Sequence, residues 1–190
     1  GTGGQFFYIY FRRPGDIKRT AFLVHKHSDR DDDRWLYLPD LDLVKRIAAG
    51  DKRTSFVGST FFYEDISGRL LSEDHHELVS EDDTYFVIKS VPRRPEEVEF
   101  AYYKTWIHKT SFIPVQIEYF DDEGTKYRLC ENKKVETIDG RPTVVRGVMH
   151  DLRRGESTLV ESSKVTYDFE LPQDVFTERY LRNPPTSYLR

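Results

Sequence analysis

A cluster of four carboxylates within five positions is the first feature of this sequence that could do chemistry. Asp29, Asp31, Asp32 and Asp33 offer the oxygen ligands that Ca²⁺ prefers. The spacing of a calcium-binding EF-hand loop, with its central glycine and late glutamate, is missing. The pattern is typical of a solvated hairpin tip, and we expect no calcium there.

A second group, His75-His76 beside Glu73, Asp74 and Glu77, could chelate a transition metal. Adjacent residues on a strand point to opposite faces, so the two imidazoles would not converge. We therefore interpret this group as a surface loop.

His25 and His27 share one face of an expected strand, which is a better geometry for a pair of ligands. No third ligand is predictable from the sequence. We expect no metal and no cofactor in this protein.

Nucleophilic catalysis is poorly supported. Ser55, Ser59 and Ser67 lie outside any G-x-S-x-G nucleophile elbow, since the local sequence is VGSTF. Cys130 lies in an expected strand and is interpreted as a half-buried, inert thiol. We expect a protein that is not an enzyme.

Composition limits the class of protein. The chain has 190 residues, a formal net charge of -4 at pH 7 and a single cysteine. The charge argues against nucleic acid as the main partner, and one cysteine excludes an internal disulfide. No run of about 18 apolar residues is present, so no membrane span is expected.

The length favours one domain over residues 1–190, with residues 182–190 as a C-terminal tail. The sequence enters an expected strand at Phe6 almost at once and has no signal peptide at its start. We therefore expect that a further N-terminal segment belongs to this domain.

The candidate side chains described above must be positioned mainly by β-strands, because apolar residues alternate with a period of two along much of the chain. The clearest strand places Ile113, Val115, Ile117 and Tyr119 on one face. Asp139-Gly140 predicts a tight hairpin. The expected strands, about eight to ten in an antiparallel meander, lie near residues 6–11, 20–25, 35–38, 43–47, 85–89, 100–107, 113–120, 127–131, 143–149 and 157–169.

Helices are expected to be few and short. Residues 174–181 could form one, with Phe176 and Tyr180 on one side, and residues 65–78 could hold a turn or two. Consecutive long antiparallel strands, such as 143–151 and 157–169, must curl as their twist accumulates. A curved sheet has an apolar concave face that either a missing segment covers or a ligand occupies.

The segment from Phe56 to Tyr63 is the most unusual part of the sequence. Phe56, Val57, Phe61 and Phe62 lie among Gly, Ser and Thr with neither helical nor strand periodicity. Large apolar side chains on irregular backbone either fill a core or line an apolar opening.

Several motifs, taken in order, resemble a known family. They are DDDRWLYLPDLDLVKRI, SFVGSTFFYEDIS, FIPVQIEYFDDEG and a C-terminal LPQDVFTERYL. Together they are similar to the outer membrane lipoprotein-sorting proteins, the LolA-like periplasmic carriers. Two positions depart from the family pattern, with Val57 in place of methionine and Thr60 in place of aspartate.

The resemblance implies a half-open β-barrel with helices across its mouth and an apolar cavity for acyl chains. It implies a carrier of lipid or lipoprotein acyl chains in the periplasm of a Gram-negative cell, with an inner-membrane transporter and an outer-membrane acceptor as partners. The expected lining is apolar, with Phe56, Phe61 and Phe62 as the residues most directly at the ligand. In full it is Phe22, Val24, Trp35, Tyr37, Phe56, Val57, Phe61, Phe62, Trp106, Ile113 and Val115.

Two alternatives stay open from the sequence. Any of these lining residues could instead be ordinary core. The same sheet face could also dock an envelope transporter or a second copy of the chain, which would make the protein an interaction module.

Overall fold

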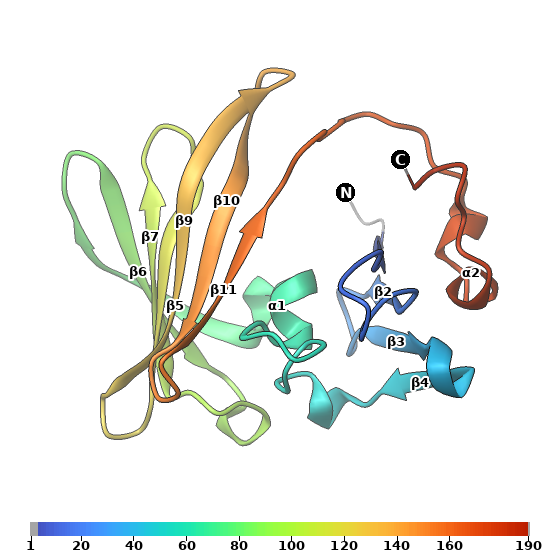
Figure 1. Ribbon diagram of the computed structural model, residues 1–190. Coiled ribbons are helices and arrows are strands. Elements are labelled where there is room, and N and C mark those ends of the chain that lie inside the picture. The colour runs from blue at the N-terminus through green and yellow to red at the C-terminus, as the bar shows by residue number, and fades with distance from the viewer. Residues whose placement is uncertain (1–3, 190) are drawn as a thin grey trace. The chain divides into compact units, whose positions relative to one another are not determined.

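The computed structural model describes residues 4–189, and within them the protein is mainly β (Figure 1). All paired strands are antiparallel, and within each of two sheets every strand pairs with its neighbours in sequence, as in the predicted meander. The strands are β1 (Gln5–Tyr10), β2 (Ala21–Lys26), β3 (Asp33–Leu38), β4 (Leu43–Ile47), β5 (Asp74–Glu81), β6 (Tyr85–Pro92), β7 (Tyr102–His108), β8 (Pro114–Phe120), β9 (Lys126–Ile138), β10 (Arg141–Asp151) and β11 (Glu156–Glu161).

Helices are few and short, as predicted. The α-helices are α1 (Tyr63–Ser67) and α2 (Arg179–Arg182), and the 3-10 turns are η1 (Pro39–Leu41), η2 (Ala49–Asp51), η3 (Leu71–Glu73), η4 (Pro95–Glu97) and η5 (Gln173–Phe176). The single helix predicted over residues 174–181 is thus divided between η5 and α2. Among residues 4–189, no helix has the length and apolar character that crossing a membrane requires.

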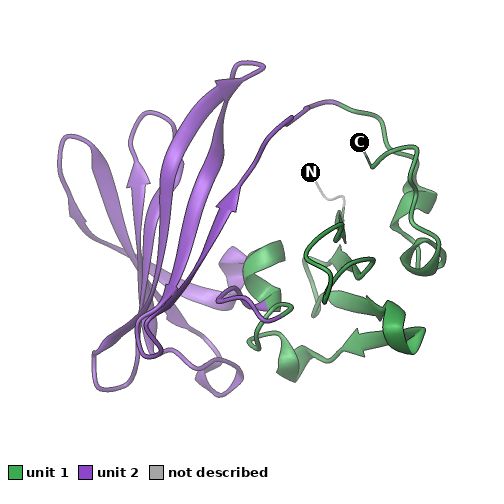
Figure 2. Ribbon diagram, viewed as in Figure 1, with its two compact units in different colours: residues 1–57, 63–68, 169–190 green, residues 58–62, 69–168 purple. Residues whose placement is uncertain are grey.

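The chain folds as two compact units (Figure 2). The described part of unit 1 comprises residues 4–57, 63–68 and 169–189, and holds a four-stranded sheet in the order β1-β2-β3-β4. Unit 2 comprises residues 58–62 and 69–168, and holds a seven-stranded sheet in the order β11-β10-β9-β8-β7-β6-β5. The strands therefore form two sheets where the sequence predicted one.

The C-terminal segment completes the core of unit 1. Leu181 of α2 is fully buried against Ala21, Leu23 and Tyr37 on one face of the four-stranded sheet. His25 Nε2 donates a hydrogen bond to the carbonyl oxygen of Phe176 in η5 (2.6 Å). The segment is held by the sheet because it covers an apolar face that would otherwise meet water.

The residues in the turns determine the hairpins of unit 2. Asp139 and Gly140 have φ of 50° and 74°, the left-handed conformations that a two-residue hairpin turn requires, and they join β9 to β10. The turns predicted at residues 121–124 and 153–155 likewise join β8 to β9 and β10 to β11.

Two predictions about elements are wrong. The strand predicted through Phe169 ends at Glu161, because Lys164 and Asp168 adopt left-handed conformations (φ 56° and 54°). His75-His76, predicted as a surface loop, lie within β5. Residues 162–169, which follow β11, are held instead by an ion pair between Asp168 and Arg141 at the start of β10 (3.0 Å).

Candidate functional site: one face of the seven-stranded sheet

The pairing register sorts the side chains of unit 2 onto two faces, which we name after Cys130 and Trp106. Directly paired residues share a face, and residues two apart on a strand share it too. A central row of the Cys130 face runs across the sheet as Leu78, Ile88, Thr105, Ile117, Cys130, Met149 and Thr158. On one side of it lies a row made of Phe86, Ile107, Pro114, Asn132, Gly147 and Val160.

Apart from Thr105 on β7, these two rows form an apolar strip over β5 to β9, made of Leu78, Phe86, Ile88, Ile107, Pro114, Ile117 and Cys130. Neighbouring strands are about 4.8 Å apart, so the strip spans roughly 19 Å across the sheet. Ile88, Ile107, Ile117 and Cys130 are half-buried, while Leu78 is 53% exposed at the edge strand. An apolar surface of this kind, accessible within a folded unit, is typical of a binding site.

A polar row borders the strip on its other side. It consists of His76, Ser90, Tyr103, Tyr119, Arg128, Asp151 and Glu156, again joined by the register. Ser90 and Arg128 are almost fully buried, at 2% and 1% exposure. The Cys130 face thus changes from apolar to polar within one step along each strand.

Hydrogen bonds within unit 2 hold several side chains of the polar row. Asp74, which is 1% exposed, accepts from Arg69 through two nitrogens (2.9 and 3.1 Å) and from the Tyr103 hydroxyl (2.8 Å). Burial, reinforced by the nearby Asp74 charge, raises the pKa of Tyr103 far above its ordinary value. Ser90 Oγ hydrogen-bonds His76 Nδ1 (2.8 Å). This end of the face is therefore structural, and its groups are closed to a ligand.

A short segment, Gly58–Phe62, lies on the Cys130 face, and we call it the strap. Thr60 fixes it with three hydrogen bonds: its amide donates to Thr158 Oγ1 (3.0 Å), its hydroxyl to the Met149 carbonyl (2.7 Å), and its carbonyl accepts from Arg128 (2.9 Å). The strap therefore covers the central row at β10 and β11, where Met149 is only 2% exposed.

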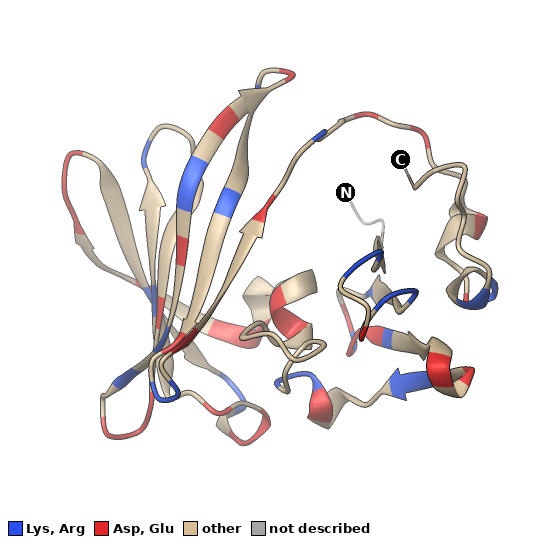
Figure 3. Ribbon diagram, in the orientation of Figure 1, with Lys and Arg blue, Asp and Glu red and all other residues tan. Residues whose placement is uncertain are grey.

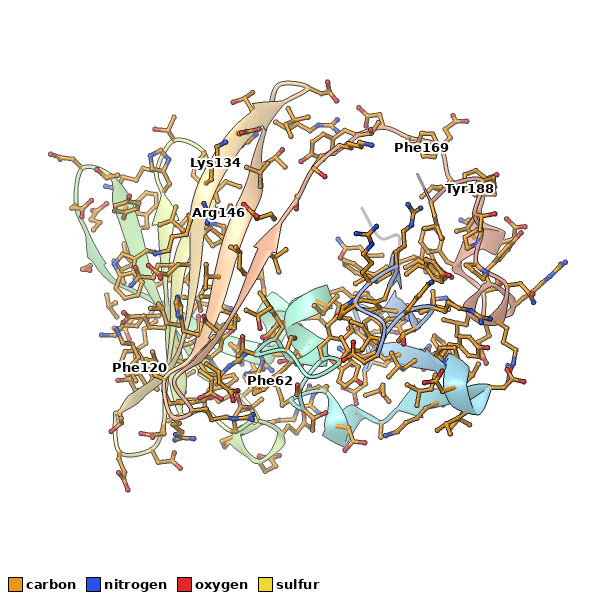
Figure 4. The ribbon with its side chains drawn as sticks, in the orientation of Figure 1. Phe62, Phe120, Lys134, Arg146, Phe169 and Tyr188 are labelled. Atoms are coloured by element: carbon orange, nitrogen blue, oxygen red, sulfur yellow. The ribbon has the colours of Figure 1, made fainter. Side chains whose placement is uncertain are left out.

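Phe62 ends the strap against Arg128. The guanidinium carbon lies 3.8 Å from the centroid of the Phe62 ring and 5.2 Å from that of Tyr119. Such stacking is favourable because the face of the ring carries partial negative charge that attracts the cation. The attraction is stronger when the pair is shielded from water. Figure 4 shows Phe62 and Phe120 on opposite sides of the seven-stranded sheet, as the register requires.

The residues flanking the strap belong to unit 1. Phe56 and Tyr63 pack together edge to face (centroids 5.5 Å apart) and both contact Phe22 (5.0 and 5.4 Å). All three are at most 7% exposed. The unusual aromatic loop of the sequence is thus divided: its two ends are core of unit 1, and its middle lies on unit 2.

The expected lining residues fall into both units. Phe22 and Val24 share one face of the four-stranded sheet, whereas Trp35 and Tyr37 lie on its other face, under the C-terminal segment. Phe56 joins Phe22, and Val57 precedes the strap with φ of 45°.

In unit 2, Phe61 and Phe62 belong to the strap, while Trp106 lies on the face opposite Cys130. Val115 is the extra residue of a β-bulge and Ile113 precedes β8. The sequence prediction missed Cys130, Ile88 and Ile107, although the alternation of β8 correctly placed Ile117 with Tyr119 on one face.

The carboxylate cluster of unit 1 is held in ion pairs. Asp33 accepts from Arg30 (2.7 Å), His27 (3.0 Å) and Arg46, and these hydrogen bonds, that from Arg30 foremost, hold its pKa far below the ordinary value. Asp32 accepts from Arg34 (2.6 Å). The prediction of a fully solvated tip is therefore wrong for Asp32 and Asp33, although a cavity of about 510 Å³ adjoins them.

Charge on unit 2 is mixed, since Figure 3 shows blue and red segments interspersed over the strands of its sheet. Several charges are paired, such as Lys126 with Glu118 (2.8 Å) on the Trp106 side. Among residues 4–189, no group of three or more His, Cys, Asp or Glu side chains is arranged to hold a metal ion. The apolar strip is thus the surface that sets this unit apart.

A family model described as "uncharacterized protein" matches residues 3–183. The chain belongs to this family. A search of curated proteins finds no match. Among solved structures, a DUF1329 family protein from Desulfovibrio piger is 27% identical with a TM-score of 0.86, over 94% of this chain and 77% of its own.

Two further solved structures are similar to this chain. One, described as an outer membrane lipoprotein-sorting protein domain from Vibrio parahaemolyticus, is 27% identical with a TM-score of 0.86, over 95% of this chain and 79% of its own. A LolA superfamily protein from Nitrosomonas europaea has a TM-score of 0.66 at 23% identity, over the same shares, and so shares the fold. The resemblance to LolA-like, lipoprotein-sorting proteins is confirmed.

Proposed function

We propose that this protein is a periplasmic, non-enzymatic carrier that binds lipid or the acyl chains of lipoproteins. One observation carries the proposal: the apolar strip is a band of partly accessible side chains on one face of a sheet, next to a row of polar side chains. Each exposed CH₂ group of an acyl chain costs about 0.8 kcal/mol in water, so a chain gains by lying on such a band.

The likeness to the Vibrio parahaemolyticus structure supports the same proposal, since that structure is described as an outer membrane lipoprotein-sorting protein domain. In this proposal, the protein is a LolA-like carrier with a half-open barrel, working in the Gram-negative periplasm. An inner-membrane transporter would deliver the cargo and an outer-membrane acceptor would receive it.

Cys130 gives the proposal a direct test, because the only cysteine of the chain lies in the middle of the strip. The rate at which a maleimide modifies Cys130 is measured with a diacylated lipopeptide and with the same peptide lacking its acyl chains. We expect the lipopeptide to slow the modification at least about tenfold at saturation, because the acyl chains would cover the thiol.

The peptide without acyl chains should leave the rate unchanged, and Cys130→Ser should abolish the labelling. Equal rates with both peptides, together with no binding of the lipopeptide in equilibrium dialysis, would refute the carrier function. Slower labelling by both peptides would indicate a peptide site and would equally contradict an acyl-chain site.

A further inference from the structure

The strap meets the apolar strip at one defined place. Cys130 on β9 is half-buried, whereas Met149, its direct partner on β10, is 2% exposed. The change coincides with Thr60, which bonds the Met149 carbonyl and Thr158 of β11. The accessible part of the central row therefore stops between β9 and β10.

The second row of the face stops at the same strand for a different reason. Its apolar members are Phe86, Ile107 and Pro114 on β6 to β8, and Asn132 follows on β9. Asn132 Nδ2 donates to the Pro114 carbonyl (2.6 Å), which fixes a polar group in line with the strip. Gly147 on β10 then offers no side chain at all. The apolar side chains of both rows thus extend from β5 to β9, and the strap closes the central row beyond Cys130.

We infer that the strap is the end wall of the acyl site and sets the length of chain that the protein takes. This inference rests on the proposed carrier function. A chain lying across the strands from β5 would bury one CH₂ group after another until it met Thr60 and Phe62. Longer chains would leave their remaining CH₂ groups in water.

The inference predicts a plateau in affinity. Each buried CH₂ group should tighten binding about fourfold, and the gain should cease once the chain reaches the strap. Loosening the strap should move the plateau to longer chains, because the central row would continue over Met149. Shorter chains, which never reach the strap, should bind as before.

Thr158→Val is the principal variant, since it removes the acceptor of the Thr60 amide and keeps the side-chain shape. Thr158→Ser is its matched control because it retains the hydroxyl. Phe62→Ala is a second variant that releases the other end of the strap from Arg128. The probe is a homologous series of saturated fatty acids from about eight to about eighteen carbons, and dissociation constants are measured for each.

We expect the plateau of Thr158→Val or Phe62→Ala to shift by at least two carbons, with about fourfold tighter binding for each carbon beyond the original plateau. Thr158→Ser should keep the original plateau. If every variant retains the original plateau while binding the short chains, the strap does not set the length of acyl chain that the site accepts. Only this inference then fails. If the native protein binds no chain of any length, the carrier function itself fails.

Discussion

The guanidinium of Arg128 lies over the ring of Phe62, with the guanidinium carbon 3.8 Å from the ring centroid. Arg128 is 1% exposed, so this contact and the hydrogen bond to Thr60 are made away from water. One buried cation thereby fixes two residues of the strap to β9.

Phe62→Ala should lower the free energy of unfolding by about 2 kcal/mol, because it removes both buried ring surface and a desolvated cation–π contact. Phe112→Ala is the control: Phe112 is 68% exposed, and its truncation should change stability by no more than about 0.5 kcal/mol. Chemical denaturation measures both. Equal losses for the two variants would show that the Arg128 contact adds nothing.

Leu78→Asp should weaken binding of a diacylated lipopeptide by about tenfold or more, because it sets a charge on the apolar strip. Val91→Asp is the matched control, since Val91 lies on the neighbouring strand but on the Trp106 face. Both side chains are exposed, at 53% and 39%, so both variants should fold. Fluorescence titration compares the two variants. A loss of binding in Val91→Asp alone would place the ligand on the Trp106 face and contradict the proposed site.

Gly58→Ala should destabilise the protein by about 1 kcal/mol. Gly58 opens the strap with φ of 80°, a conformation that costs a residue with a β-carbon roughly that amount. Gly50→Ala is the control, because Gly50 has no positive φ and nothing lies within 4 Å of an added β-carbon. Thermal unfolding should separate the two, and a loss as large in Gly50→Ala would contradict the conformational explanation.

The stability of unit 1 should fall at acidic pH in a way that depends on Asp33. The hydrogen bond from Arg30, then those from His27 and Arg46, hold the pKa of native Asp33 far below the ordinary value. Below about pH 4 the unfolded chain takes up a proton at Asp33 that the native protein does not, so stability is full above that pH and declines as pH falls toward the native pKa.

Asp33→Asn should remove this part of the pH dependence and lower stability at neutral pH, where the ion pairs are lost. Asp16→Asn, on an exposed loop, should leave the profile of the native protein unchanged. Denaturation midpoints between about pH 2 and about pH 7 test the prediction. If the stability of Asp33→Asn falls with pH in parallel with that of the native protein, the role of Asp33 is contradicted.

Local signals in the sequence were sufficient for much of the fold. Asp139-Gly140 and the alternation of residues 143–149 specify their hairpin through backbone chemistry alone, and β9 and β10 follow. Residues 162–169 were misread because Val165, Tyr167 and Phe169 alternate as a strand would. Their path is decided instead by long-range contacts, such as the hydrogen bond between Tyr167 and Thr143 (2.6 Å).

The candidate site was only partly predictable for a similar reason. The sequence marked the aromatic loop as unusual, and its middle does form the strap. It could not divide Phe56 from Phe62, because both are aromatic and only six positions apart, while Phe56 packs on Phe22 and Phe62 on Arg128. Alternation predicted Ile117 on one face, but which strands join it depends on register across the whole sheet.

Unit 1 is built from pieces at the two ends of the chain, with nearly all of unit 2 between them. During synthesis on the ribosome, every strand of unit 2 has therefore emerged before Leu181, the fully buried residue that closes the core of unit 1. Leu181 therefore covers Ala21, Leu23 and Tyr37 of the four-stranded sheet only after the strands of unit 2 have been synthesised. Assembly of this protein is thus vectorial, with the seven-stranded sheet available first and the core of unit 1 closed last.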